Sequence, residues 1–260
     1  MITAVFFDLY GTLAGFQPSR YEIQSEALAD FGISVTPEGI LRGYNLADAF
    51  MSHQNATKPV RSLSRDENRV FFSEYERRVL RGAGVEVSQE EAWQIWRRIR
   101  KIEYGLALYD DTIPALNACK QMGLTVGLIS NMNQSGDQLA ESMGLQPHLD
   151  FSITSQEVGA EKPSLLIFER ALERANTQPE HAVHVGDQLT SDVAGAVNAG
   201  INAVLLDRDG NHTDYTAQPR ITELAELPEL LGGSSLSDTE SKLTRKDVEW
   251  TGSDEYRVVH

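Results

Sequence analysis

Residues 3–12 of the chain read Thr3-Ala4-Val5-Phe6-Phe7-Asp8-Leu9-Tyr10-Gly11-Thr12. The β-branched and aromatic residues before Asp8 predict a short buried strand over residues 3–9, and the glycine predicts a turn after it. A carboxylate that directly follows buried apolar residues is expensive to desolvate unless it is paired or binds a cation. Asp8 is therefore either a turn-capping residue or part of a functional site at the end of this strand.

Four more apolar runs of the same kind predict strands at residues 124–130, 148–154, 182–186 and 202–206. Stretches with helical periodicity lie between them, at residues 112–122, 135–143, 165–175 and 191–199. Three of these stretches are followed by Gly123, Gly144 and Gly200, where a helix commonly ends in the left-handed conformation. Strands that alternate with helices predict an α/β fold with a doubly wound, Rossmann-like parallel sheet.

Residues 16–106 interrupt this alternation, because they contain helical patterns and no strand pattern. The expected helices cover residues 20–31, 37–50, 65–81 and 88–102. An insertion after the first strand emerges at the carboxyl edge of the sheet, where open α/β folds bind ligands. We therefore expect a helical cap, although a subdomain that serves stability alone would show the same pattern. The expected domains are a core of residues 1–15 and 107–231, a cap of residues 16–106 and a flexible polar tail of residues 232–260.

The 260 residues carry 23 basic and 38 acidic side chains, which gives a net charge of −15 with histidine neutral. Such a surface repels phosphate backbones and anionic membranes, and argues against nucleic-acid or membrane partners. The single Cys119 provides neither an intramolecular disulfide nor a cysteine metal site. Because the sequence shows neither a signal-peptide pattern nor an apolar run of transmembrane length, we expect a cytoplasmic protein. The sequence does not predict its oligomeric state.

Three further segments place polar residues at the ends of predicted strands or the starts of predicted helices. They are Ser130-Asn131, Lys162-Pro163 and the turn that contains Asp187 and Asp192. Each has an ordinary explanation: a helix N-cap for the serine, a solvated loop for the lysine, and a cap plus a surface residue for the aspartates. Right-handed connections, however, bring the carboxyl ends of parallel strands to one edge of the sheet. Two carboxylates on such a turn are also suitable oxygen ligands for Mg²⁺.

Taken in this order, Asp8…Thr12, Ser130, Lys162-Pro163 and Gly186-Asp187…Asp192 resemble the motifs of the haloacid dehalogenase (HAD) superfamily of hydrolases. The long helical insertion after the first motif resembles the subgroup with an inserted helical cap. The resemblance extends over residues 3–230. It implies a hydrolase with a Rossmann-like core that acts on a small anionic molecule.

The resemblance implies that Asp8 is the nucleophile and forms a covalent aspartyl intermediate, which divides a difficult displacement into two steps. In phosphatase-like members, Ser130 would hydrogen-bond a phosphoryl oxygen and Lys162 would supply positive charge to Asp8 and the transferring group. Thr12 and Asn131 are the further candidates for substrate binding, and Thr12 is also expected to order its loop.

The same resemblance implies a Mg²⁺ ion. The Asp8 carboxylate, the Tyr10 backbone carbonyl and Asp187 would hold it, with Asp192 behind a water molecule. The metal neutralises the two anions that must meet, the nucleophile and the phosphoryl group. An acidic protein would then contain one local cationic pocket.

The chain departs from the phosphatase pattern at Tyr10, where most phosphatases of this family carry a second aspartate as general acid and base. A phenol, whose reference pKa is about 10, does not serve as a base near neutrality without a large shift. Loss of such a group typically lowers the rate by about 10²–10⁴-fold. The sequence therefore predicts weak phosphomonoesterase activity or a restriction to substrates with good leaving groups.

Residues 8–12 also resemble the 2-haloacid dehalogenase branch, whose carboxylate displaces halide from carbon without a metal and without a proton donor. That branch carries Ser in place of Asp187, Asn in place of Leu189 and Tyr in place of Phe168. Without a metal, Asp187 beside Asp8 would repel a haloacid carboxylate. We therefore favour the Mg²⁺-dependent phosphatase interpretation. Dehalogenation remains an alternative, as does a weakly catalytic binding or regulatory protein, which the Tyr10 departure also allows.

Overall fold

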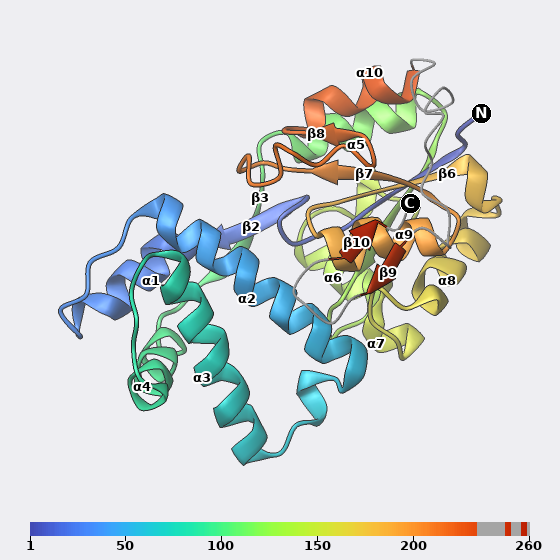
Figure 1. Ribbon diagram of the computed structural model, residues 1–260. Helices are drawn as coiled ribbons and strands as arrows, with labels where there is room; N and C mark the ends of the chain where they lie inside the picture. Colours follow the sequence, from blue (N-terminus) through green and yellow to red (C-terminus); the bar gives the residue numbers. More distant parts are fainter. Residues whose placement is uncertain (233–247, 251–255, 259–260) are drawn as a thin grey trace. The chain divides into compact units, whose positions relative to one another are not determined.

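The computed structural model of the chain describes residues 1–232, 248–250 and 256–258 (Figure 1). It divides into two compact units, Met1–Gly15 with Leu108–His260, and Phe16–Ala107. Within the predicted tail, β9 (Val248–Trp250) and β10 (Tyr256–Val258) form a short antiparallel pair. The remainder of that predicted flexible tail lies outside the described residues.

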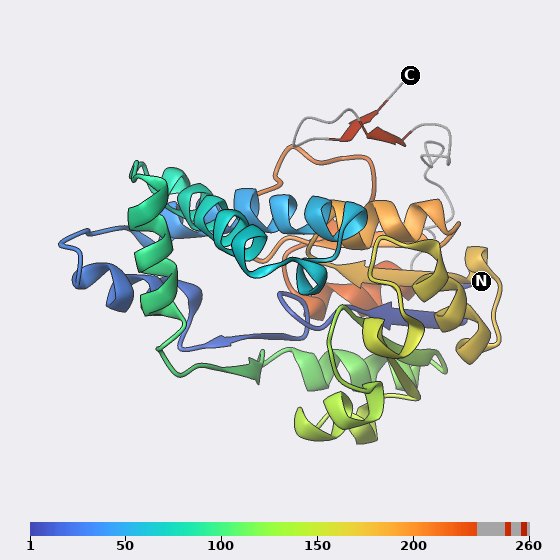
Figure 2. The same ribbon diagram turned by 90° about the horizontal axis from the view of Figure 1, so that it is seen from below.

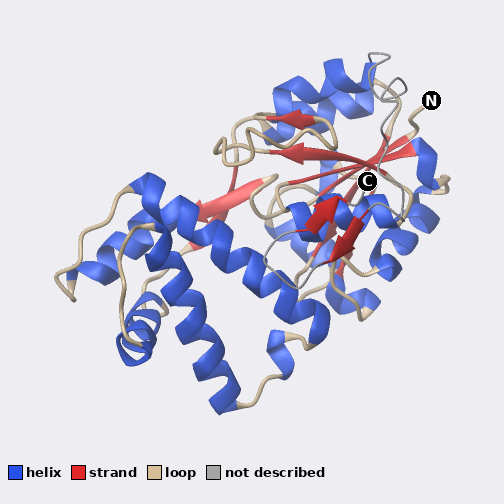
Figure 3. Ribbon diagram, in the orientation of Figure 1, coloured by secondary structure: helices blue, strands red, loops and turns tan. Residues whose placement is uncertain are grey.

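The first unit is built on a six-stranded sheet in which all neighbouring strands are parallel (Figure 3). The strands are β1 (Ala4–Phe7), β4 (Thr125–Ser130), β5 (Phe151–Thr154), β6 (Ala182–Gly186), β7 (Asn202–Leu206) and β8 (Arg220–Ile221). Their order across the sheet is β5-β4-β1-β6-β7-β8, so β1 lies between β4 and β6. Since the strand order reverses direction on either side of β1, this is the doubly wound α/β sheet that the sequence predicted.

Helices cover both faces of the sheet (Figure 2). On one face pack α8 (Leu165–Ala175) and α9 (Gly195–Asn198), and on the other packs α5 (Thr112–Gln121), with α10 (Leu227–Gly232) against it. Two further helices of the unit are α6 (Gly136–Ser142) and α7 (Ser155–Val158). Successive side chains of β1 point to opposite faces of the sheet, and both sets are apolar. Helices must therefore cover both faces of this strand. Ala4 and Phe6 join the cluster under α8, and Val5 and Phe7, which point the other way, are also fully buried.

Several boundaries differ from those predicted. The third predicted strand begins only at Phe151, because Gln146–His148 form a turn of 3₁₀-helix. The helix predicted over residues 191–199 opens instead with a π-helical segment, Leu189–Ala194. Strand β8 was not predicted, since two residues carry no periodic pattern. The three predicted helix-ending glycines do adopt positive φ, at 78°, 68° and 78°.

The single cysteine, Cys119, lies on α5 and is fully buried. Burial raises the pKa of its thiol to about 12. The thiol therefore stays protonated at neutral pH, and only the thiolate is an effective nucleophile. Cys119 serves as a small apolar residue of the core.

The second unit consists of four helices joined by short connections. They are α1 (Arg20–Ala29), α2 (Pro37–Thr57), α3 (Arg65–Gly82) and α4 (Gln89–Ile99). The chain enters and leaves this unit along β2 (Ala14–Gln17) and β3 (Gly105–Leu108), which pair with each other. Across the described residues, every helix is too short or too polar to cross a lipid bilayer.

Three of these helices begin with a capping box. A serine hydroxyl accepts a hydrogen bond from the backbone N–H of a glutamate three residues on, whose carboxylate accepts one from the serine N–H. The pairs are Ser19–Glu22, Ser64–Glu67 and Ser88–Glu91. Helix α2 starts instead at the Thr36 cap and continues to Thr57, beyond the predicted end at residue 50, because it packs along α3.

Helix α4 buries one apolar face, which consists of Ala92, Ile95 and Ile99. Trp96 is half-buried and stacks on Phe72 with ring centroids 4.4 Å apart. Trp96 therefore packs against the apolar cluster of the helical unit.

A buried polar cluster lies between α1, α2 and α3. The Gln24 side-chain amide donates hydrogen bonds to Glu76 Oε2, at 3.3 Å, and to the Tyr44 hydroxyl, at 3.2 Å. Gln24 and Glu76 are fully buried, and among the described residues neither Oε1 atom has a hydrogen-bond partner. Burial raises the pKa of Glu76 from 4.5 to about 8, and the Gln24 hydrogen bond opposes this only in part. The carboxyl group is therefore largely protonated at neutral pH.

Substitution of this carboxyl group changes how stability depends on pH. Between pH 4.5 and about 8 the folded chain holds a proton on Glu76 that the unfolded chain releases, so stability falls as pH rises through this interval. The limiting slope is about 1.4 kcal/mol per pH unit. In Glu76→Gln this contribution disappears, and we expect the variant to be more stable than the wild type at pH 8 by about 4 kcal/mol, with little difference at pH 5.

Denaturant-induced unfolding at a series of pH values measures this difference. Glu103→Gln, at an exposed position of the same unit, is the matched control and should follow the wild-type curve. A constant difference between Glu76→Gln and the wild type at all pH values would contradict the assignment.

Candidate active site

The ends of three adjacent strands place the predicted residues at one edge of the sheet. Phe7 of β1 lies opposite Leu128 of β4 and Val185 of β6. Asp8 follows Phe7, and its backbone N–H donates to the Val185 carbonyl at 3.0 Å. Ser130 and Asp187 come two residues after those partners, so the structure brings the first, second and fourth segments together. This is the carboxyl edge, where open α/β sheets bind ligands.

Lys162, from the third segment, joins two of the acidic residues. Its ammonium donates to Asp8 Oδ1 and to Asp192 Oδ1, each at 2.5 Å. The lysine side chain is 2% exposed, and those of Asp8 and Asp192 are 10% and 1% exposed. Because all three charged groups are buried, solvent and salt screen their ion pairs much less than at the surface. Lys162 is therefore part of the acidic cluster and not a solvated loop residue.

Asp192 accepts hydrogen bonds at both carboxylate oxygens. Oδ1 accepts from Lys162 and lies 3.0 Å from His184 Nε2, and Oδ2 accepts from the Gln188 backbone N–H at 3.1 Å. A Cβ atom on Gly186 would fall onto the Asp192 carboxyl group. The glycine at the end of β6 is therefore required for the first turn of the π-helical segment to bring Asp192 inward.

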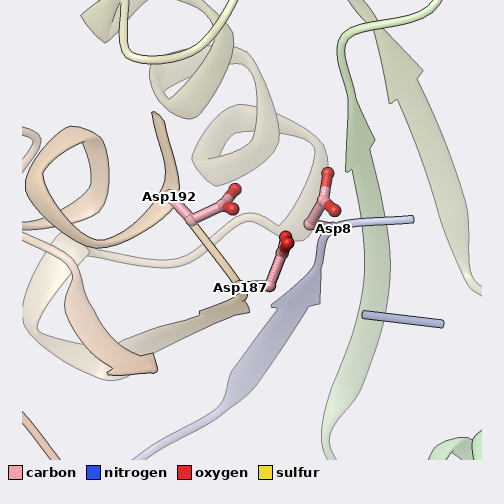
Figure 4. A group of neighbouring side chains, drawn as sticks. All are labelled: Asp8, Asp187 and Asp192. Atoms are coloured by element: carbon pink, nitrogen blue, oxygen red, sulfur yellow. The ribbon is translucent and has the colours of Figure 1, made fainter. Parts of the chain in front are cut away.

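Gly11 has the same relation to Asp187. Its φ of +85° is in the left-handed region, and a Cβ atom there would overlap the Asp187 carboxylate. The loop after β1 (residues 8–13) therefore packs directly against this carboxylate. In Figure 4 the side chains of Asp8, Asp187 and Asp192 converge, and ligand oxygens of the three lie within 4.8 Å of one another.

This donor set fits a magnesium ion. Mg²⁺ prefers carboxylate oxygens, usually one or two with several waters. The protein supplies three carboxylates and the single ammonium of Lys162 at this point, so the cluster carries excess negative charge that a dication would neutralise. Asp8 and Asp187 are the residues that would hold the ion. Asp192 already contacts three protein groups. This agrees with the predicted role in which Asp192 binds the ion through a water molecule.

The pKa values follow from burial and from these pairs. Burial raises the pKa of Asp8 to about 6, with Lys162 opposing the rise and Asp192 adding to it. Burial also acts on Asp192, but Lys162 and His184 hold its pKa well below its usual range. Burial alone would lower the pKa of Lys162, yet the two carboxylates raise it above the usual value. Of these two carboxylates, Asp8 is therefore the one whose pKa lies above its usual range.

The remaining candidates occupy different places. Ser130 is buried at the end of β4. The Asn131 side chain pairs with the Lys162 backbone, accepting from its N–H at 2.7 Å and donating to its carbonyl at 3.1 Å. Thr12 is fully buried, and its hydroxyl has no hydrogen-bond partner among the described residues. Tyr10 is half-buried, in a backbone bridge with Ala14. In this geometry Asn131 orients Lys162, and Thr12 packs within its loop.

The sequence motifs did not point to His184, whose side chain contacts Asp192. The histidine is buried and packs edge-on against Phe168, with ring centroids 5.2 Å apart. Burial lowers its pKa, so it is neutral and its Nε2 donates to Asp192. The available signal was the His-x-Gly spacing on β6, which places His184 and Gly186 on one face of the strand. Both therefore face the carboxylate that enters from the next segment.

The family model of the haloacid dehalogenase-like hydrolases matches residues 2–200, and the chain belongs to this family of hydrolases. It is 29% identical over 245 residues to the glyceraldehyde 3-phosphate phosphatase of Methanothermobacter thermautotrophicus, across 87% of this chain and 100% of that one. It is 26% identical over 264 residues to the ribulose-1,5-bisphosphate 5-phosphatase of Halopiger xanaduensis, across 89% and 100%. The structure of a 2-haloacid dehalogenase from Pseudomonas syringae is similar with a TM-score of 0.53 at 25% identity, across 89% and 98%.

Gly11→Ala tests the contact between the loop after β1 and Asp187. The new methyl group would displace the carboxylate, so we expect magnesium affinity to fall by about 10–100-fold, as is typical when groups that orient metal ligands are lost. Isothermal titration of the protein with Mg²⁺ measures this.

Gly123→Ala is the matched control, because Gly123 has φ +78° and open space around it. Both variants should lose about 1–2 kcal/mol of stability from the left-handed backbone. Only Gly11→Ala should lose magnesium affinity, and equal affinities in the two variants would contradict the assignment.

Proposed function

We propose that this hydrolase is a Mg²⁺-dependent phosphatase that acts on a small phosphorylated metabolite through an Asp8 nucleophile. The supporting observation is the convergence of Asp8, Asp187 and Asp192, of which Asp8 and Asp192 also accept hydrogen bonds from the buried ammonium of Lys162. A carboxylate nucleophile that must approach an anionic phosphoryl group needs concentrated positive charge. Lys162 supplies one charge, and a magnesium ion on Asp8 and Asp187 supplies the rest.

The chemistry assigned to the residues has two steps. An Asp8 oxygen attacks phosphorus, and the P–O bond to the leaving group breaks as the aspartyl phosphate forms. Water then attacks the phosphorus of this intermediate, which releases inorganic phosphate and restores the Asp8 carboxylate. Lys162 holds one oxygen of Asp8 and thereby fixes the orientation of the nucleophile, and Ser130 is proposed to donate to a phosphoryl oxygen. The bound Mg²⁺ would lower the repulsion between the two anions.

Tyr10 stands where most phosphatases of the family have their general acid. In the first step the leaving oxygen would then take its proton from solvent, because a phenol of ordinary pKa is not matched to proton transfer near neutrality. The proposal therefore favours substrates with good leaving groups. It also predicts that hydrolysis of alkyl phosphates is limited by proton transfer to the leaving oxygen.

Two relatives that cover nearly the whole chain are named as phosphatases of phosphorylated sugars, and this supports the proposal. The similarity to a 2-haloacid dehalogenase structure and the Tyr10 position favour the second candidate, metal-independent displacement of halide from carbon. Asp187 argues against it, because its carboxylate lies beside Asp8 and would repel a haloacid.

The assay that separates these candidates uses an aryl phosphate and 2-chloropropionate, each with Mg²⁺ and with a chelator. We expect phosphate release that requires the metal. Chloride release that survives the chelator would establish the dehalogenase instead. If neither compound were turned over, the result would favour the alternative of a weakly catalytic binding or regulatory protein.

In Asp8→Asn we expect turnover to fall by about 10³-fold or more, as when other nucleophiles are removed. The amide has the same shape, so the unfolding transition should remain cooperative. Asp137→Asn, at an exposed position, is the matched control and should retain full turnover. An Asp8→Asn protein that still turns over the aryl phosphate would show that another residue is the nucleophile.

Tyr10→Asp should raise kcat for an alkyl phosphate by about 10²-fold, because it restores a carboxylic acid in the position of the general acid. The gain should be smaller for an aryl phosphate, whose leaving group needs no proton. Tyr10→Asn is the matched control, since asparagine has the same size as aspartate but its amide does not act as a general acid. Equal gains in both variants would mean that steric relief, and not acid catalysis, explains the effect.

A further inference from the structure

We propose that Arg208 is a positioning residue that holds the loop after β1, and through it the nucleophile and the metal ligands, in the active geometry. The inference rests on the proposed function for its catalytic consequence, but its structural basis is independent. Arg208 lies just after β7, far from Asp8 in the sequence, and the motifs of the sequence did not point to it.

The Arg208 guanidinium contacts three groups at once. Nη2 donates to the Thr12 backbone carbonyl at 2.8 Å and to Asp111 Oδ1 at 2.8 Å. Nη1 donates to Asp111 Oδ2 at 3.0 Å, and the guanidinium carbon lies 4.2 Å from the centre of the Tyr109 ring. A planar fork with five donors suits such a bidentate contact, and a lysine ammonium does not reproduce it.

Asp111 fixes the arginine from the other side. Its carboxylate also accepts from the Leu224 backbone N–H, at 2.9 Å. Burial alone would raise the pKa of Asp111, yet Arg208 and this N–H lower it. The side chains of Arg208 and Asp111 are 18% and 20% exposed, so water screens the pair only in part. The guanidinium is therefore held in one orientation as it reaches the Thr12 carbonyl.

A second anchor acts on the next carbonyl of the loop. The Leu13 carbonyl accepts from the Thr112 hydroxyl at 2.6 Å and from the Tyr109 backbone N–H at 3.0 Å. Within the loop, the Leu9 carbonyl accepts from the N–H groups of Leu13 and Ala14, each at 2.8 Å. The loop is thus closed internally and is anchored from outside through its Thr12 and Leu13 carbonyls.

The anchored loop contains the atoms on which the proposed reaction depends. Asp8 is its first residue, Tyr10 contributes the predicted backbone ligand, and Gly11 packs against Asp187. Thr12 is one residue from Gly11, so release of its carbonyl lets this packing loosen. The Arg208 guanidinium hydrogen-bonds to the Thr12 carbonyl and to Asp111, and it lies over the Tyr109 ring. It acts through the backbone, which is why it is a positioning and not a catalytic residue.

The test uses Arg208→Met and the milder Arg208→Lys in the full chain, with Arg220→Met as the matched control. Arg220 forms a second arginine–aspartate pair of the same unit, in which its Nη1 donates to Asp207 Oδ2 at 2.9 Å. We expect the Arg208 variants to bind Mg²⁺ about 10–100-fold more weakly by isothermal titration. Turnover of the aryl phosphate at saturating Mg²⁺ should fall by a similar factor with KM nearly unchanged, and the Arg220 variant should change neither quantity.

Hydrogen exchange at the Leu13 and Ala14 amides gives a readout that does not depend on activity. We expect faster exchange in the Arg208 variants, and wild-type exchange in Arg220→Met. If the Arg208 variants and Arg220→Met showed equal exchange and equal magnesium affinity, the inference would be overturned. If the wild type itself takes up no Mg²⁺, the proposed function fails, and exchange alone then decides whether Arg208 holds the loop.

Discussion

The contact on which the site depends is that of the Lys162 ammonium with the carboxylates of Asp8 and Asp192. Burial of three charged groups is unfavourable unless each finds partners, and loss of one partner leaves an uncompensated charge. The surrounding structure supplies those partners, since Asn131 fixes the lysine backbone and His184 adds a donor to Asp192. The sheet order, with β1 between β4 and β6, brings these groups within reach of one another.

Two glycines show how closely the backbone surrounds this charge cluster. Gly11 leaves space that the Asp187 carboxylate occupies, and Gly186 leaves space for that of Asp192, so both carboxylates depend on the absence of a Cβ there. The geometry of the site therefore depends on these two glycines as well as on the charged side chains. A Cβ at either position would overlap a carboxylate, so a larger residue there would displace it and weaken the local concentration of charge.

Much of the fold followed from local patterns in the sequence. Strands β6 and β7 were predicted to the residue, and four polar segments were assigned to one sheet edge, because buried parallel strands leave a strong apolar signal. The full length of α2 was not predicted, since it depends on packing against α3, and β8 was not predicted because two residues carry no periodic pattern. The π-helical segment was expected to be an ordinary helix that starts at residue 191. Arg208 was missed because its partners come from separate parts of the chain.

The burial of Cys119 has a practical consequence for work on this molecule. A thiol with a pKa near 12 that is shielded from solvent reacts slowly with maleimides and with peroxide. The sequence contains no other cysteine. A cysteine introduced on the surface would therefore be labelled selectively by a fluorophore or spin probe, without prior removal of the natural one.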